Sequence, residues 1–484
     1  MQLVPLLLAV LACTKSADVK TDKTHDTSQP AVVPLEDLVT IDALIGHLEA
    51  LQDIADANDG HRSGVSPGYF ASLNYAEGVL EEAGYSVERV PFQYPGWEQL
   101  GPTELEADGQ VFVAGEQVAA MYYSPPGEAD GPLEAVDLVL PPTPTTSSTS
   151  GCEPEDFNGF TPGSIALLQR GECAFTNKVE NAEAAGAIAA VVFNEGQGGR
   201  RDLEGFQVEP GNSLTIPVVC TDFDTGDLLA AAVAAGPVQT RVVVDALSEI
   251  FESENLIVET EGGDPDNVLV VGGHLDSVPE GPGINDNGSG TALVIELAVQ
   301  MAVRDVEPRN KVRFALWGAE ELGLLGSTAY VEGLPESEVD KIAAKLNFDM
   351  LASPNGAPMI YDGDGSTFGI PGPVGSPLIE DIFAEWFEIN GEVEDRTSFD
   401  GRSDYQAFIA EGIPAGGLFS GADDEKTPEQ ESAFGGTVDQ LHDPCYHKAC
   451  DDIGNVNEGL YETLSKAAAY GTDELAEIDW DAEL

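Results

Sequence analysis

The stretch Asn267-Val-Leu-Val-Val-Gly-Gly-His274 is the strongest indication of the fold, because it predicts a buried strand that ends on a histidine. Two more apolar stretches end on polar groups. Lys311-Val-Arg-Phe-Ala-Leu-Trp317 leads into Glu320 and Glu321, and Lys345-Leu-Asn-Phe-Asp349 ends on a carboxylate. Apolar strands that alternate with helical runs favour the open, mainly parallel sheet of an α/β domain. Because such sheets build their sites at the carboxyl ends of strands, we expect these polar groups to line one site.

Two further carboxylates lie between the first two strands. Asp276 is the second residue after His274, and Asp286 lies 12 residues after that histidine, within Asn285-Asp-Asn-Gly-Ser-Gly290. The latter stretch leads into helical spacing over residues 291–303. Asp286 is therefore predicted on a loop at the amino terminus of a helix.

Composition excludes some classes of function. The 484 residues include 21 Lys and Arg against 86 Asp and Glu, so the formal net charge is −65 at pH 7. A nucleic-acid binder needs a basic surface to neutralise phosphates. The large excess of acidic residues therefore excludes a protein that binds nucleic acid electrostatically. With 42% hydrophobic residues the chain can bury sizeable cores, and its length suggests about two to four domains. The carboxylate density favours a high-salt setting, with general solubility or binding of structural Ca²⁺ as alternatives.

The amino terminus resembles an export signal. Residues 1–12 are apolar and uncharged, are too short to span a bilayer, and precede Cys13. The string Val10-Leu11-Ala12-Cys13 resembles a bacterial lipoprotein box, in which the cysteine becomes the lipid anchor. The usual positive charge is missing, so plain secretion or a wrongly assigned start is the alternative. We expect residues 1–13 to be a signal ending at the anchor, residues 14–34 to be a flexible tether, and the protein to be a cell-envelope lipoprotein or secreted.

A second unit follows a Pro/Thr/Ser connector at residues 141–150, which is expected to be extended and exposed. Gly163-Ser-Ile-Ala-Leu-Leu-Gln-Arg-Gly171, Cys173-Ala-Phe175 and Val191-Val-Phe-Asn194 resemble a protease-associated domain. That resemblance implies a small α+β module without a catalytic site. The expected boundaries are 35–135 and 247–475 for an interrupted domain, 136–246 for the inserted domain, and 476–484 for an acidic tail.

Six cysteines fit an oxidising compartment, where pairs persist as disulfides. Cys445 and Cys450 lie close enough to close a small loop, and Cys152 can pair with Cys173 across the inserted domain. Cys220 would then remain as a buried, unreactive thiol in an apolar strand.

Five motifs in one order carry a second resemblance. They are Gly273-His274-Leu-Asp276, Asn285-Asp-Asn-Gly-Ser-Gly290, Glu320-Glu321-x-Gly323, Asn347-Phe-Asp349-Met350 and Asp443-Pro-Cys-Tyr-His447. Together they resemble the co-catalytic di-zinc aminopeptidases of the aminopeptidase Y and bacterial leucyl aminopeptidase family, over most of residues 35–475. Some members of that family carry the same inserted domain. The resemblance implies a zinc-exopeptidase domain of the phosphorylase/hydrolase-like type, with three α/β/α layers and a mainly parallel central sheet.

The resemblance further implies two Zn²⁺ ions per chain. Asp286 would bridge them, His274 and Asp349 would hold one ion, and Glu321 and His447 would hold the other. Imidazole and carboxylate groups suit zinc, and five ligands shared between two ions leave an open position for water. A water that bridges two dications loses its proton near neutral pH and becomes the nucleophile.

The same resemblance implies roles for residues around the metals. Glu320 would act as the general base that takes the proton from water and delivers it to the departing amine. Tyr446 would donate a hydrogen bond to the oxyanion, and Asp276 would hold the His274 ring in its tautomer. The peptide bond between Asp286 and Asn287 is expected to be cis.

The implied substrates are peptides with a free amino terminus. In the family, carboxylates near the metals and a turn corresponding to Gly401-Arg402-Ser403-Asp404 hold the amine. Met350 and Phe419 match positions that line the side-chain pocket, so we expect a preference for Leu, Met or Phe at the amino terminus. We expect a monomer that binds no nucleic acid and contacts a membrane only through its lipid anchor.

Other interpretations stay open. A carboxypeptidase or dipeptidase of the same fold would differ in whether amino-terminal acetylation of the substrate abolishes cleavage. Glutaminyl cyclases of related fold use one zinc, which the five-ligand set argues against. A receptor-like binding protein without activity would have lost ligands, whereas this chain keeps all five and Glu320.

Overall fold

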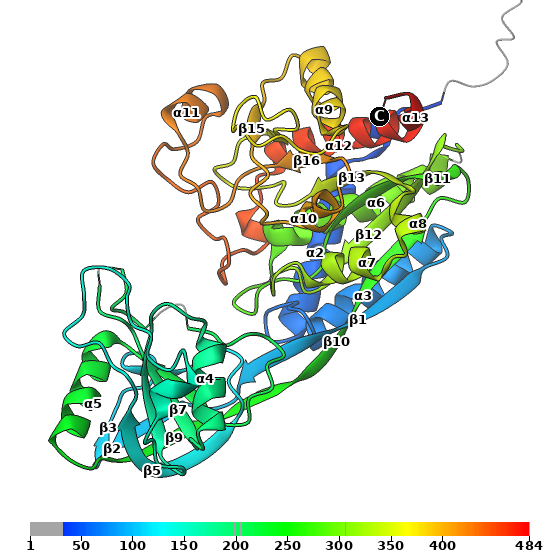
Figure 1. The fold of residues 1–484 in the computed structure, drawn as a ribbon. Helices are drawn as coiled ribbons and strands as arrows, with labels where there is room; N and C mark the ends of the chain where they lie inside the picture. Colours follow the sequence, from blue (N-terminus) through cyan, green and yellow to red (C-terminus); the bar gives the residue numbers. More distant parts are fainter. Residues whose placement is uncertain (1–31, 198, 204–205, 305, 484) are drawn as a thin grey trace, which may run out of the picture.

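The computed structural model describes residues 32–483 except 198, 204–205 and 305. The described chain forms two lobes connected by a long β-ribbon (Figure 1). The ribbon consists of β1 (Glu88–Gln99) and β10 (Ala246–Glu259), which pair antiparallel along the whole of β1. We call residues 32–99 and 246–483 the large lobe and residues 100–245 the small lobe. The predicted signal, its anchor Cys13 and residues 14–31 of the predicted tether lie outside the described residues.

The large lobe is built on an eight-stranded mixed sheet. In spatial order the strands are β1, β10, β12 (Asn310–Trp317), β11 (Asp264–His274), β13 (Ile342–Phe348), β16 (Ala415–Phe419), β14 (Met359–Tyr361) and β15 (Asp395–Thr397). The central strands β12, β11, β13 and β16 run parallel, whereas β10 and β14 pair antiparallel with the outer members of this group. The predicted α/β domain with a mainly parallel central sheet is confirmed.

Helices cover both faces of this sheet, because alternate residues of its strands are apolar on both sides. In β11, Leu269 and Val271 belong to one core, and Val268 and Val270 belong to the core on the opposite face. The first face carries α1 (Leu35–Leu38), α2 (Ile41–Ala57), α3 (Pro67–Glu82), α6 (Gly290–Arg304), α9 (Ser376–Asn390) and α12 (Glu458–Glu477). The second face carries α7 (Leu325–Gly333), α8 (Glu336–Val339) and α10 (Tyr405–Ala410). These are the three predicted layers.

The small lobe has a second eight-stranded sheet flanked by two helices. In spatial order its strands are β3 (Gln110–Val111), β2 (Glu104–Ala107), β9 (Gln239–Val244), β5 (Gly127–Ala135), β6 (Ile165–Gln169), β7 (Ala189–Phe193), β8 (Val218–Thr221) and β4 (Val118–Ala120). The helices are α4 (Phe175–Ala184) and α5 (Phe223–Ala235), and a 3₁₀ turn, η1, spans Pro154–Phe157. A disulfide joins Cys152 to Cys173, and Cys220 is a free, buried thiol.

The small lobe begins earlier in the chain than the expected boundary at residue 136. The four strands β2 to β5 all join the small sheet, and β9 pairs with β2 on one side and with β5 on the other. An alternating pattern indicates a strand but does not indicate which sheet the strand joins. Residues 100–135 therefore belong with the inserted lobe and not with the first part of the interrupted domain.

The connector that was expected to be exposed and the expected acidic tail are both partly buried. Ser148 and Ser150 of the connector are fully buried, and the Ser148 backbone N–H donates to Glu195, 3.1 Å away. Short polar side chains are tolerated inside a protein when their polar groups find partners. The expected acidic tail is not separate either, because α12 continues to Glu477 and Trp480 in α13 (Trp480–Glu483) packs into the core of the large lobe.

No helix within the described residues combines the length and the apolar character that crossing a membrane requires.

Candidate active site

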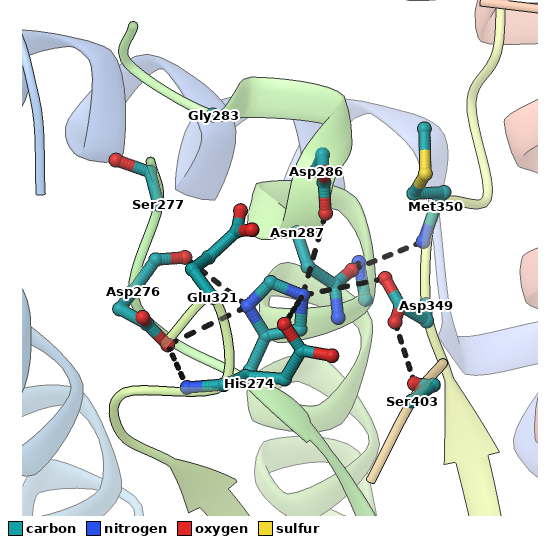
Figure 2. A network of polar contacts seen from close by, with 12 residues as sticks. His274, Asp276, Ser277, Gly283, Asp286, Asn287, Glu321, Asp349, Met350 and Ser403 are labelled. Carbon is teal, nitrogen blue, oxygen red and sulfur yellow. Dashed lines mark hydrogen bonds and ion pairs between the residues drawn. The ribbon is translucent and has the colours of Figure 1, made fainter. Parts of the chain in front are cut away.

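Three parallel strands bring polar residues to one edge of the large sheet. β11 ends at His274, and its neighbours β12 and β13 end shortly before Glu320 and immediately before Asp349. Because these strands are parallel and adjacent, their carboxyl ends lie side by side. Figure 2 shows the His274 imidazole surrounded by the side chains of Asp276, Asp286 and Asp349.

The Asp286 carboxylate lies between two histidines. Its Oδ1 is 3.3 Å from Nε2 of His274, and its Oδ2 is 3.2 Å from Nε2 of His447. His274 Nε2 is also 3.4 Å from Oδ1 of Asp349, and His447 Nε2 is 3.0 Å from Oε2 of Glu321. The five residues predicted as metal ligands thus come together as two groups that share Asp286.

Glu320 lies at the same point. Its Oε2 is 3.9 Å from Nε2 of His274. Donor atoms of His274, Glu320 and Asp349 lie within 4.8 Å of one another, as do those of His274, Asp286 and Glu321. Glu320 thus lies near enough to the cluster to be a ligand, although it is farther from His274 than Asp286 and Asp349 are, and its separate role rests on the resemblance and on its chemistry.

Several buried carboxylate oxygens of the cluster accept no hydrogen bond from the described residues. Asp276 Oδ2, Glu321 Oε1 and Asp349 Oδ1 are buried and accept no hydrogen bond from the part of the chain that the structure describes. Burying such atoms is costly unless a hydrogen bond or a metal ion compensates. Imidazole and carboxylate donors around a common point are the donor set that suits zinc, so the residues present fit a metal centre.

The pKa values of the cluster show the same crowding of negative charge. Burial, followed by the neighbouring Asp286 carboxylate, raises the pKa of Glu321 to about 8. Burial also raises the pKa of Glu320 well above its usual range, and Asp404 and Asp349 add to this effect although His274 opposes it. So many buried carboxylates are stable together only if cations lie among them.

The surrounding carboxylates favour the protonated, cationic form of both histidines. Burial alone would lower the pKa of His274, but Glu320 and Asp349 raise it well above its usual value. Hydrogen bonds to Asp286 and Glu321 outweigh burial at His447 and raise its pKa to about 10. Divalent ions would take over this neutralising role and release both rings to act as neutral ligands.

A ring of polar contacts orients the cluster. Asp276 Oδ1 lies 3.6 Å from His274 Nδ1 and accepts the backbone N–H of Glu320 at 3.0 Å. The Ser403 hydroxyl donates to Oδ2 of Asp349 at 2.6 Å. Asp276 thus lies where it can orient the His274 ring, as predicted, and it also holds the loop that carries Glu320.

The loop that carries Asp286 is held by two residues that sequence reasoning missed. The peptide bond between Asp286 and Asn287 is cis. The Asn287 side chain accepts the backbone N–H groups of Gly290 and Met350 and donates to a β13 carbonyl. Asp451 accepts the backbone N–H of Asp286 at 3.0 Å. Because the chain contains so many acidic residues, its sequence does not single out Asp451. The one available signal is its position directly after the predicted Cys445–Cys450 loop.

A cavity of about 410 Å³ opens over the cluster. Met350 and Phe419 line it, as predicted, together with Tyr361. Tyr446 also lines it, its ring stacks on His447, and its hydroxyl accepts a hydrogen bond from Arg402 at 3.1 Å. The predicted metal and substrate residues, Glu320 and Tyr446 therefore line one cavity, and Asp276 lies buried behind His274.

The loop that carries Tyr446 and His447 is closed by the Cys445–Cys450 disulfide. Asp451 follows this loop directly and reaches back to the Asp286 backbone. His447 within this loop and Asp451 directly after it thus both contact the Asp286 segment.

A second acidic group contains Asp362, Asp364 and Glu380. Unlike the main cluster, its oxygens have partners within the protein. Asp362 accepts backbone N–H groups of residues 367 and 368, and Glu380 accepts Nε of Arg396 at 2.5 Å. The structural Ca²⁺ considered from composition stays a prediction.

Comparisons with known proteins agree with the site and the fold. The profile of peptidase family M28 matches residues 255–472, and that of the PA domain matches residues 134–229. An aminopeptidase of Pseudomonas aeruginosa is 45% identical over 437 residues, which are 90% of this chain and 80% of that protein. The probable lipoprotein aminopeptidase LpqL of Mycobacterium tuberculosis is 39% identical, covering 90% and 85% of the two chains. Leucine aminopeptidase 2 of Trichophyton tonsurans is 37% identical, covering 97% and 92%.

Solved structures share the fold. An aminopeptidase from Aneurinibacillus sp. strain AM-1 superposes with a TM-score of 0.64 at 25% identity, over 90% of this chain and 94% of that one. A zinc aminopeptidase from Bacillus subtilis gives a TM-score of 0.59 at 23% identity, over 90% and 95%.

Together, the fold and the relatives define an α/β aminopeptidase, a hydrolase that acts on peptides, into which a second domain is inserted. Within that class the chain belongs to peptidase family M28, and its insert is a PA domain.

Proposed function

We propose that this M28 aminopeptidase is an exported enzyme that uses two zinc ions to remove an amino-terminal Leu, Met or Phe from peptides. The observation that carries the proposal is the Asp286 carboxylate, whose two oxygens each lie within 3.3 Å of a different histidine. A carboxylate in that position can bridge two ions. His274 and Asp349 would hold one of them, and Glu321 and His447 the other.

The bound zinc ions would supply Lewis-acid chemistry, which lowers the pKa of water and polarises the substrate carbonyl. Glu320 would act as the general base. Its carboxylate lines the cavity and its pKa is raised by burial, so it can hold a proton taken from water until the leaving amine accepts it.

Tyr446 would stabilise the negative charge that develops on the carbonyl oxygen. Arg402 donates to the Tyr446 oxygen, so the phenolic hydrogen is free to point into the cavity. Asp276 would hold the His274 ring in one orientation.

The substrate preference rests on the lining of the cavity. Met350 and Phe419 present apolar surface beside the cluster and favour an apolar amino-terminal side chain. The relative named leucine aminopeptidase supports this preference. The turn that contains Arg402 lies at the same cavity and would help to hold the free amine.

Export is supported by two disulfides and by the relative named a lipoprotein aminopeptidase. We propose Cys13 as the lipid anchor of a monomeric protein in the cell envelope, with plain secretion as the alternative.

Hydrolysis of leucine p-nitroanilide beside its N-acetylated analogue tests the proposal. We expect purified protein that starts after Cys13 to cleave only the free-amine substrate, to lose activity on chelation and to regain it with zinc. Cleavage of both substrates would remove the anchoring of the amine from the proposal. Cleavage of neither by zinc-loaded protein would favour a carboxypeptidase or a receptor-like protein.

A further inference from the structure

The segment of residues 275–283 connects His274 to the loop of Asp286, so its shape sets the distance between two of the proposed ligands. It has no regular secondary structure. A loop without such structure leaves many backbone carbonyls unpaired, and buried carbonyls need donors from elsewhere. In this segment three of the carbonyls find their donor in a single side chain from a distant part of the sequence.

Arg62 is that donor. It lies between α2 and α3, outside the part of the chain that matches the M28 profile, and its side chain is fully buried. Its guanidinium donates to the carbonyl of Leu275, to that of Pro282 at 2.9 Å and to that of Gly283 at 2.6 Å. One planar group thus holds both ends of the segment.

Neighbouring contacts extend this hold to the middle of the segment. The backbone N–H of Arg62 donates to Ser277 Oγ at 3.0 Å, and that hydroxyl donates to the Gly281 carbonyl at 3.0 Å. Gly283 has a φ of +64°, and a Cβ there would lie 2.4 Å from the Asp286 carbonyl. The chain turns sharply here, directly before Asp286.

The charge of Arg62 also bears on the cluster. Burial lowers its pKa to about 10, while Asp276, Asp451 and Asp286 raise it, so the group stays charged at neutral pH. Burying an arginine is costly. Neutral donors could have paired these carbonyls, but a guanidinium has five N–H donors in a rigid fork and reaches three acceptors at once.

We propose that Arg62 is a positioning residue that sets the spacing of His274 and Asp286 and thereby the affinity of the site for zinc. This inference rests on the proposed two-zinc function. Arg62 acts through the backbone of residues 275–283, at no point touching the substrate. Residues that orient metal ligands contribute about 10- to 100-fold to metal affinity.

The test compares Arg62→Met and Arg62→Lys with the parent chain. Zinc affinity is measured by competition with a chromophoric chelator, and folding by circular dichroism and thermal unfolding of the metal-free proteins. We expect both variants to fold and to lose about 10- to 100-fold in affinity for zinc. Lysine should not rescue, because one ammonium group cannot reach the three carbonyls that the guanidinium fork joins.

Arg304 supplies a matched control. It is another nearly buried arginine of the large lobe, and it pairs with Asp473 at 2.5 Å instead of with a loop beside the cluster. Arg304→Met should lower the unfolding temperature and leave zinc affinity unchanged. Equal losses of zinc affinity in the Arg62 and Arg304 variants would overturn the proposal, because they would report general destabilisation.

Other outcomes are equally decisive. Unchanged zinc affinity in folded Arg62→Met overturns the proposal, and full rescue by lysine overturns positioning through three carbonyls. If Arg62→Met does not fold, Ser277→Ala decides, because it removes the acceptor of the Arg62 backbone N–H and the donor to the Gly281 carbonyl, leaves the guanidinium in place, and should still weaken zinc binding. If the parent chain binds zinc without cleaving leucine p-nitroanilide, the proposed function fails while the Arg62 inference can still hold.

Discussion

In both lobes, buried polar side chains lie where parallel strands end at the edge of a sheet. In the small lobe these are Gln169, at the end of β6, and Asn194 and Glu195, just after β7. Glu195 accepts the backbone N–H groups of Ser147 and Ser148 and is paired with Arg200 at 3.0 Å. The polar atoms of these side chains are already engaged in hydrogen bonds that hold loops of the small lobe.

The equivalent edge of the large lobe differs in what its polar groups lack. Asp276, Glu321 and Asp349 each keep one buried oxygen that accepts no hydrogen bond from the described residues, and both histidines face carboxylates of the same cluster. A buried carboxylate at the end of a strand is therefore not in itself a sign of a site. Buried carboxylate oxygens without hydrogen bonds, gathered around one point, distinguish the candidate metal-binding edge from the structural one.

The largest expected difference between the two edges concerns Glu320. We expect Glu320→Gln to lower kcat by about 10²- to 10⁴-fold on leucine p-nitroanilide, because the amide cannot take a proton from water. Both zinc ions should remain, as measured by metal analysis of the dialysed protein. Loss of a zinc ion would make Glu320 a ligand, and full activity would remove its role as base.

The two disulfides sharpen the comparison. Replacing Cys445 and Cys450 by serine frees the loop of His447, so we expect zinc affinity and activity to fall by about 10- to 100-fold.

Replacing Cys152 and Cys173 opens a loop with a sequence separation of 21 and should cost about 3 kcal/mol of small-lobe stability. The rate per zinc-loaded molecule should then stay unchanged. Chelator competition and thermal unfolding separate the two effects, and an equal loss of zinc affinity in both double variants would contradict the comparison.

Sequence reasoning reached the residues that follow apolar strands, because an abrupt end of a buried run marks the edge of a sheet. His274 and Asp349 were predicted in this way, and the resemblance added Tyr446 and His447. Arg62 was missed because its partners are backbone carbonyls, which leave no trace in the side-chain pattern.

The pairing of residues 100–135 with the small sheet was not predicted, for a different reason. Strands β2 to β5 have ordinary alternation, and only their pairing with β9 assigns them to the small sheet. Pairing between distant strands depends on the tertiary fold, so a local pattern cannot supply it.

The smallest expected effect concerns Glu195. It is the buried carboxylate at the edge of the small-lobe sheet, and both of its oxygens have hydrogen-bond partners. Burial would raise its pKa, but the hydrogen bonds from Ser147, Ser148 and Arg200 outweigh burial and lower it below the usual 4.5. The unfolded chain therefore binds this proton more tightly than the folded chain does. The stability that the ionised group contributes is present above pH 4.5 and is lost as the pH falls through the folded pKa. Glu195→Gln should cost about 1.5–3 kcal/mol near neutral pH, and thermal unfolding should show this difference shrinking as the pH falls. Zinc affinity should not change, because every oxygen of Glu195 already serves the small lobe. A variant that lost zinc would show that the two edges are coupled, and the distinction between a structural and a metal-binding edge would then not hold.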